Sequence, residues 1–229
     1  MKTNLFFLCF ALTACQGLVG SGRIVTDERP VTAFKKIAVH SGINAVTTSG
    51  PRALTVRTDD NVQSQVETFV QGDTLVVRLV HNTVLAVGRV EATISNDVFE
   101  GLDASGGADV TITATPITRF DLTASGGSDV HLRGLNSDDF TIDASGGSDV
   151  TIEGTANRGD VIASGGSTLR LADVPLESLD MDASGGSTVN ARVSSMITGS
   201  ASGGSTVTIV GTPTNRVDRS GGSEVSVGR

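Results

Sequence analysis

The chain has 229 residues, a formal net charge of -8 and 28 glycines, and it contains neither tryptophan nor tyrosine. The acidic balance and the missing aromatic platforms argue against nucleic-acid binding, which uses basic stripes and aromatic stacking. The glycine-rich, aromatic-poor composition favours thin stacked layers over a thick globular core.

Residues 1–14 have the pattern of a lipoprotein-type signal peptide. Lys2 supplies a positive start, and Leu5 to Leu12 is an apolar run too short to span a bilayer as a helix. Leu12-Thr13-Ala14-Cys15 resembles a bacterial lipobox, which implies that Cys15 carries several acyl chains and anchors the protein to a membrane. Gln16 favours the outer membrane, so we expect an extracytoplasmic outer membrane lipoprotein. An ordinary secretory peptide cleaved nearby is the alternative.

The only other cysteine, Cys9, lies inside the expected signal peptide, so the mature chain is expected to have no disulfide. Residues 15–30 combine Cys15 with glycine and polar residues, and we expect them to form a flexible tether. Residues 31–98 contain strand-like runs without a regular repeat. We expect these residues to form irregular N-terminal β coils that cap the segment after them, because an open strand edge invites pairing with another chain.

Residues 99–229 repeat Ser-Gly-Gly at a nearly constant spacing. The residues that precede the seven copies are separated by 20, 20, 19, 20, 18 and 18 positions: Ala104, Ala124, Ala144, Ala163, Ala183, Ala201 and Arg219. A period of this size is typical of a solenoid, in which each repeat stacks on its neighbours. The glycine pair suits a corner with positive φ and close backbone packing.

Apolar and polar residues alternate on both sides of each glycine pair, as in Phe140, Ile142 and Ala144 before one pair and Val150 and Ile152 after it. This period of two predicts strands with one buried face. A connection within one repeat is too short for a helical crossover, so the chain must wind. The pattern therefore predicts an all-β, single-stranded parallel β-helix (β-solenoid), right-handed, with about 18–20 residues per coil.

The segment from His40-Ser41-Gly42-Ile43-Asn44 through Gly72-Asp73 to the Ser-Gly-Gly coils resembles the putative auto-transporter adhesin, head GIN domain family. Gly42-Ile43-Asn44 stands where the motif behind that name would fall. The resemblance covers roughly residues 31–229. It implies a β-helical fold in secreted or envelope proteins whose molecular function is poorly defined.

Carboxylates recur in register beside the corners. Asp109, Asp129 and Asp149 occupy one outward slot in three successive coils, and Asp103 and Asp143 recur on the other side of the corner. Like charges about 5 Å apart repel by roughly 1 kcal/mol in water, and a cation such as calcium would relieve this. The favoured interpretation is a solvated acidic face that discourages aggregation, so no metal or cofactor is assigned.

No Ser/His/Asp order or metal-ligand spacing connects His40, His81 and His131, and no catalytic residue is predicted. We expect a non-enzymatic structural, adhesive or ligand-binding surface with an envelope protein or glycan as partner, and self-association through the solenoid ends is a further expectation. The alternative is a carbohydrate-active enzyme or carbohydrate-binding module of the parallel β-helix type.

Overall fold

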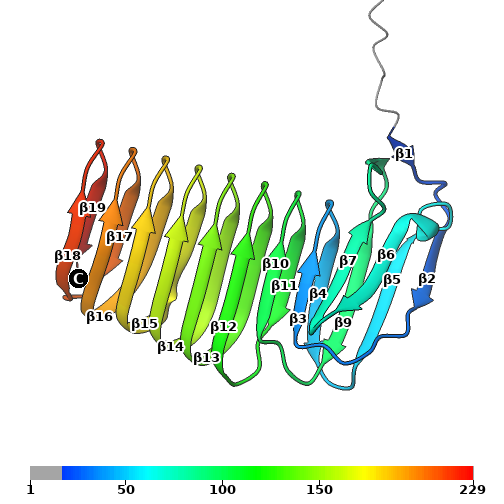
Figure 1. The fold of residues 1–229 in the computed structure, drawn as a ribbon, viewed down its shortest axis with the longest axis horizontal. Coiled ribbons are helices and arrows are strands. Elements are labelled where there is room, and N and C mark those ends of the chain that lie inside the picture. The colour runs from blue at the N-terminus through cyan, green and yellow to red at the C-terminus, as the bar shows by residue number, and fades with distance from the viewer. Residues whose placement is uncertain (1–16, 229) are drawn as a thin grey trace, which may run out of the picture.

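A computed structural model describes residues 17–228, which form an all-β chain wound into a flattened solenoid (Figure 1). Strands before and after each corner pair in parallel with their equivalents in the next coil. This confirms the predicted β-solenoid. The strands of the stack are β3 (Lys36–Val39), β4 (Asn44–Ser49), β10 (Gly101–Ala104), β11 (Asp109–Thr113), β12 (Ile117–Ala124), β13 (Asp129–Ala144), β14 (Asp149–Ala163), β15 (Thr168–Ala183), β16 (Thr188–Ala201), β17 (Thr206–Val210), β18 (Thr214–Arg219) and β19 (Glu224–Gly228).

The pairing register follows the repeat seen in the sequence. Ala104 pairs with Ala124, and Ala124 pairs with Ala144. After the corner, Val130 pairs with Val150 in the same way. Side chains of one column therefore stack along the solenoid on directly adjacent coils, as the repeat length predicts. The right-handed sense of the coil stays a prediction.

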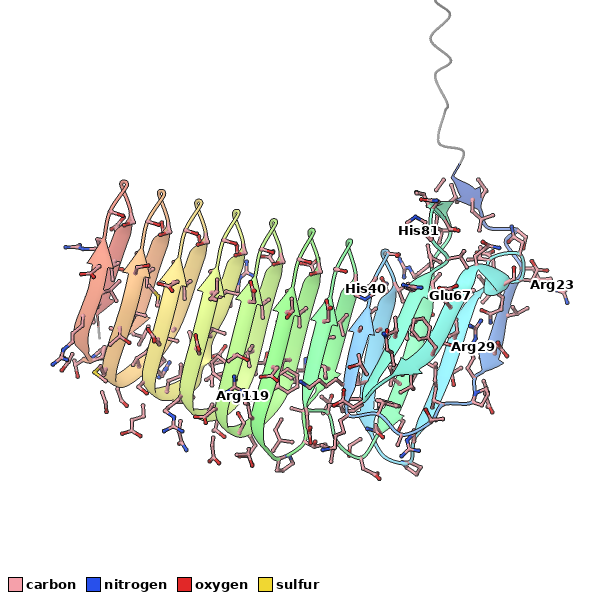
Figure 2. The ribbon with its side chains drawn as sticks, in the orientation of Figure 1. Arg23, Arg29, His40, Glu67, His81 and Arg119 are labelled. Carbon is pink, nitrogen blue, oxygen red and sulfur yellow. The ribbon has the colours of Figure 1, made fainter. Side chains whose placement is uncertain are left out.

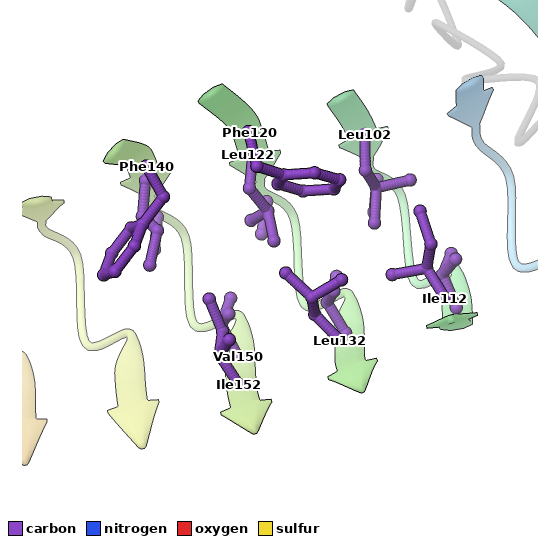
Figure 3. Packing of buried hydrophobic residues seen from close by; sticks show 14 of the residues in the cluster. Leu102, Ile112, Phe120, Leu122, Leu132, Phe140, Val150 and Ile152 are labelled. Atoms are coloured by element: carbon purple, nitrogen blue, oxygen red, sulfur yellow. The ribbon is translucent and has the colours of Figure 1, made fainter. Parts of the chain in front are cut away.

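The core is a continuous row of apolar side chains between the two layers of strands (Figure 3). Val130, Leu132, Phe140 and Ile142 are almost completely buried, and Figure 3 shows such residues pointing inward from successive coils. Each buried side chain of this size contributes roughly 1.5–3 kcal/mol. Because each coil packs on the next, the apolar surface of one coil is covered only when its neighbours are folded.

Each Ser-Gly-Gly corner is a two-glycine turn that needs positive φ at both central positions. In the corner between Ser145 and Ser148, Gly146 has φ 64° and Gly147 has φ 79°, and the Ser148 amide donates to the Ser145 carbonyl at 3.3 Å. A Cβ at Gly146 would lie 3.0 Å from the backbone nitrogen of Gly126 in the preceding coil. The first glycine is therefore also required for close stacking of the corners.

The N-terminal part covers one end of the stack, and its chain order differs from its spatial order. Its elements are β1 (Leu18–Val19), β2 (Ile24–Glu28), β5 (Ala53–Asp59), the 3-10 helix η1 (Gln63–Gln65), β6 (Val66–Gln71), β7 (Thr74–Leu79), β8 (Leu85–Val87) and β9 (Glu91–Asn96). Strands β7 and β9 pair in parallel with β3 and β4 on the side opposite to β10 and β11. The coil made by β7 and β9 thus lies outside the coil that precedes it in the chain.

The outermost strands are antiparallel. Strand β5 pairs with β9 and β2, and β6 pairs with β7. The expectation of irregular coils thus applies only to part of residues 31–98, because a hairpin and two antiparallel strands also close this end. Within the described residues, no helix is long and apolar enough to cross a membrane.

The expectation that residues 15–30 form a flexible tether needs correction, because most of residues 17–30 pack against this end of the solenoid. Strand β1 pairs with β8, and β2 pairs with β5 along five residues, Ile24 to Glu28. The Gly22 amide donates to the Asp59 carboxylate at 2.6 Å. The guanidinium of Arg29 donates to the carbonyl of Gln63 at 3.0 Å. These contacts give the Gly22 amide and the Gln63 carbonyl hydrogen-bond partners within the protein. The composition of the segment does not reveal them.

Candidate functional site

The predicted acidic column exists as a row of neighbouring side chains on one outer face. Asp109, Asp129 and Asp149 lie directly opposite one another on β11, β13 and β14. The next member of the column is Thr168. Side chains of this row project into solvent because the adjacent Val130 and Val150 fill the core. The three carboxylates are therefore one strand spacing apart, about 4.8 Å.

A shallow depression of about 220 Å³ accompanies the acidic column. The Arg170 guanidinium lies 3.4 Å from the Asp149 carboxylate, and His131 lies 3.2 Å from Glu153. The guanidinium of Arg170 thus partly balances the charge of the column at Asp149. The depression is lined by Asp109, Thr111, Asp129, Val130, His131, Asp149, Thr151 and Arg170.

Two further predicted carboxylates lie on the other layer. Asp103 and Asp143 belong to β10 and β13 before their corners, and Thr123 separates them in the column. The structure therefore does not gather the five predicted carboxylates at one place. Over residues 17–228, no three or more His, Cys, Asp or Glu side chains are close enough to hold a metal ion. Cation binding by the acidic column stays a hypothesis.

A second depression lies on the layer before the corners, and sequence reasoning did not find it. It has a volume of about 300 Å³ and lies across β12 to β16. We call it the outer groove. Its lining residues are Arg119, Asp139, Phe140, Thr141, Arg158, Gly159, Asp160, Ser178, Leu179, Asp180, Met196 and Thr198.

Two adjacent columns of side chains form the rims of the outer groove. One contains Arg119, Asp139, Arg158, Ser178 and Met196, and the other contains Thr141, Asp160, Asp180 and Thr198. The groove thus follows the solenoid axis and crosses the strands. Its signal in the sequence is the alternation of charge in the first column. That signal is visible only when the coils are aligned, because successive members of the column are 20, 19, 20 and 18 residues apart in the sequence.

At one end of the outer groove, arginine, lysine and aspartate side chains form ion pairs with one another. Arg158 donates to both Asp139 oxygens, at 2.7 and 3.0 Å, and this interaction lowers the pKa of the Asp139 carboxyl. Arg119 and Lys36 contact Asp121 at 2.9 and 3.0 Å. Such bidentate and shared contacts fix the direction of the guanidinium groups.

Asp121 is the most perturbed carboxyl group in this network. Partial burial raises its pKa, but hydrogen bonds from Arg119, Thr141 and Lys36, together with the charge of Lys36, outweigh burial and lower the pKa to about 2. Thr141 donates its hydroxyl to Asp121 at 2.8 Å. The carboxylate is therefore ionised at neutral pH and joins three coils of the solenoid.

The groove floor depends on one missing side chain. Gly159 occupies the inward position between Phe140 and Leu179 in neighbouring coils. A Cβ at Gly159 would lie 2.8 Å from the Phe140 ring. The ring thus uses the space that a side chain at Gly159 would need. The result is a mixed surface, with an apolar floor and rims of hydroxyl, carboxylate and guanidinium groups, which can hydrogen bond a polar ligand.

Fold and surface together define a class: a parallel β-solenoid with shallow polar depressions on its outer faces. The chain belongs to the family described as putative auto-transporter adhesin, head GIN domain, whose model matches residues 33–213. This confirms the family resemblance found in the sequence. No curated protein shows significant similarity to the chain.

Solved structures share the fold at low sequence identity. A protein described as a putative adhesin from Bacteroides fragilis is 19% identical, with a TM-score of 0.85, over 93% of this chain and 100% of that one. A protein described as a putative lipid binding protein from Parabacteroides distasonis is 15% identical, with a TM-score of 0.71, over 93% and 99%. A putative adhesin from Parabacteroides merdae is 14% identical, with a TM-score of 0.71, over 93% and 98%. At these identities the similarity shows the fold.

Proposed function

We propose that this protein is a lipid-anchored envelope protein that uses its solenoid as a non-catalytic binding surface for glycans or proteins of the envelope. The outer groove is the observation that carries the proposal. The guanidinium of Arg158 and the carboxylate of Asp139 hold each other in fixed directions along its rim, and the depression is open to solvent. A preorganised surface of this kind favours binding, because little side-chain entropy is lost when a ligand arrives.

Envelope attachment is supported by the N-terminal sequence and by the relatives. Leu12-Thr13-Ala14-Cys15 resembles a lipobox, and Cys15 lies outside the described residues. The family description and the neighbours from Bacteroides and Parabacteroides name adhesins, and one neighbour is described as lipid binding. An outer membrane location and lipidation at Cys15 are the finer parts of the proposal.

Membrane fractionation tests the anchor. We expect the full-length protein to sediment with membranes and to incorporate a radiolabelled acyl group. Cys15→Ser should abolish both, whereas Cys9→Ser should change neither, since Cys9 would be removed with the signal peptide. Acylation that persists in Cys15→Ser protein would contradict the assignment.

A binding experiment tests the surface. Detergent-solubilised full-length protein is applied to a panel of defined envelope oligosaccharides and peptidoglycan fragments. Arg158→Ala should weaken binding at least about tenfold, because it removes a guanidinium and frees Asp139, a change of about 1.4 kcal/mol or more. Arg133→Ala is the matched control, since Arg133 is exposed and lies away from the groove lining. Equal loss in both variants would contradict a role of the groove.

The alternative is a carbohydrate-active enzyme or carbohydrate-binding module of the parallel β-helix type. The mixed lining of the outer groove, with Asp139, Asp160 and Asp180 on successive coils, is the observation that favours it. Release of reducing ends or unsaturated products from the same oligosaccharides would establish catalysis. Binding without product formation would support the non-catalytic function.

A further inference from the structure

A small apolar projection stands at the N-terminal end of the solenoid. It is formed by β1 and β8, and we call Leu18, Val19, Val84, Leu85 and Val87 the valine tip. Val19, Val84 and Val87 are 56%, 55% and 61% exposed. Figure 1 shows β1 projecting at this end, on the side of the stack where the Ser-Gly-Gly corners lie. Exposed apolar clusters of this kind mark contact with a protein or a membrane.

The tip is built by two short segments that pair apart from the main sheet. The Leu18 amide donates to the Val84 carbonyl and the Gly20 amide to the Val87 carbonyl, both at 2.7 Å. Gly17 packs against Ala86, since a Cβ at Gly17 would lie 2.6 Å from the Ala86 Cβ. The tip therefore keeps its valines on the surface by backbone pairing.

Neighbouring contacts attach this tip firmly to the solenoid. The Ser21 amide donates to the Asn61 side chain at 2.9 Å, and Asn61 donates to the Val19 carbonyl at 2.8 Å. Asp59, which is 3% exposed, accepts from the Gly22 amide at 2.6 Å. A movement of the tip would break these bonds, so the tip and the end of the solenoid move together.

The charges around the tip are balanced. Residues 74–90 and residues 16–26 contain no Asp or Glu, but their arginines contact acidic side chains of neighbouring segments. Arg23 lies 3.6 Å from Asp60, Arg78 lies 2.9 Å from Glu67, and Arg89 lies 3.9 Å from Glu91. Figure 2 shows His81 beside the tip as well. The feature that distinguishes the tip is therefore its exposed apolar surface and not its charge.

The position of the tip along the chain indicates what it contacts. Only three residue steps separate Cys15 from Leu18, a reach of at most about 11 Å. If Cys15 carries the lipid, the tip must lie near the acyl chains, because the docked β1 leaves no longer path. A lipid surface is therefore the partner that the remaining length of chain allows.

We propose that the valine tip inserts into the membrane surface and, with the lipid on Cys15, holds the N-terminal end of the solenoid against the bilayer. This inference rests on the proposed lipid anchor. It goes further by assigning a second membrane contact to the folded domain. Shallow insertion at the headgroup level, about 5–10 Å deep, is the range observed for interfacial apolar segments.

Site-specific fluorescence tests the tip in the full-length lipoprotein. Val87→Cys and, separately, Ile162→Cys are made in the Cys9→Ser background and labelled with bimane, since the Cys15 thiol is consumed by the lipid. Ile162 is a matched control because it is 47% exposed and lies on β14, far along the solenoid (Figure 1). Both proteins are reconstituted into vesicles of brominated phosphatidylcholine and brominated phosphatidylglycerol. Val84→Cys is an independent second probe.

We expect brominated lipid to quench the label at Val87 and Val84 at least about twofold more than the label at Ile162, since quenching requires contact with acyl chains. Equal quenching at all three positions, in protein that still sediments with the vesicles, would refute insertion of the tip but would leave the lipid anchor on Cys15 unaffected. Membrane release of the wild-type protein would overturn both. Disulfide formation between two Val87→Cys chains would show that a second copy covers the tip and would also overturn the proposal.

Discussion

The hydroxyl of Ser148 donates a hydrogen bond to the carbonyl of Ala124, one coil earlier, at 3.1 Å. Ser148 is completely buried, and the same carbonyl accepts the Ser145 amide at 2.9 Å. The relationship repeats along the solenoid in the pairs Ser128–Ala104, Ser167–Ala144, Ser187–Ala163, Ser205–Ala183 and Ser223–Ala201. Six of the corners are thus tied to the preceding coil by a serine hydroxyl, in a bond that is buried in all of them except the last.

Ser148→Ala should lower the stability of the solenoid by about 1 kcal/mol, the usual net value of one hydrogen bond. The effect stays modest because the Ala124 carbonyl keeps its bond from Ser145. Ser195→Ala, at an exposed position, is the control and should change nothing. Urea unfolding followed by circular dichroism measures both, and equal midpoints for the two variants would refute the role of the ladder.

Gly146→Ala should cost more than Gly147→Ala. Both residues have positive φ, which costs an alanine roughly 1–2 kcal/mol. At Gly146 the new Cβ would also lie 3.0 Å from the backbone of Gly126, whereas at Gly147 nothing lies within 4 Å. Thermal melting compares the two variants, and the opposite order would contradict the stacking of the corners.

Val150→Asp should unfold several coils together. Val150 is completely buried in the core shared by neighbouring coils, and an unpaired charge there costs about 3–5 kcal/mol. Hydrogen exchange should show lost protection in β13, β14 and β15, with Thr151→Asp on the outward side as control. Loss confined to the mutated strand would contradict a shared core.

Acid should remove the stabilisation that Asp121 provides. The pKa of Asp121 is about 2 in the folded protein and about 3.9 in an unfolded chain. Between these values the unfolded state binds more protons, so stability falls as the pH is lowered. The contribution is complete above about pH 4 and is lost through about pH 2. Asp121→Asn should flatten this part of the stability profile, and an unchanged profile would refute the network.

Calcium should not stabilise the acidic column. Asp109, Asp129 and Asp149 lie in a row on neighbouring strands, and residues 17–228 contain no cluster able to hold a metal. We expect the same melting temperature in calcium and in EDTA for the wild type and for Asp129→Asn. A rise in calcium that Asp129→Asn abolishes would instead establish a cation site.

Much of the solenoid was predictable because its repeat is local. The spacing of Ala124 and Ala144 sets the register of neighbouring coils. The alternation around Val150 separates buried from exposed positions. Glycine pairs such as Gly146-Gly147 mark the corners, since few other residues adopt positive φ twice in succession.

The N-terminal end was less predictable because its contacts join distant segments. Strands β7 and β9 stack outside β3 and β4, an order that no local spacing encodes. The glycine-rich segment before β2 has the composition of a tether. It is nevertheless docked, because Asp59 and Asn61, more than 35 residues later, accept its amides.

By itself, the sequence determined the all-β class, the coil length, the corners and the family, because each depends on a pattern that recurs within about 20 residues. The tertiary structure decided which outward side chains become neighbours. It brought Arg158 onto Asp139 in the outer groove and placed Val19 beside Val87 at the tip. The first contact depends on the exact register between coils and on side-chain directions, which the repeat length alone does not give. The second depends on a docked strand that pairs with a segment far away in the chain.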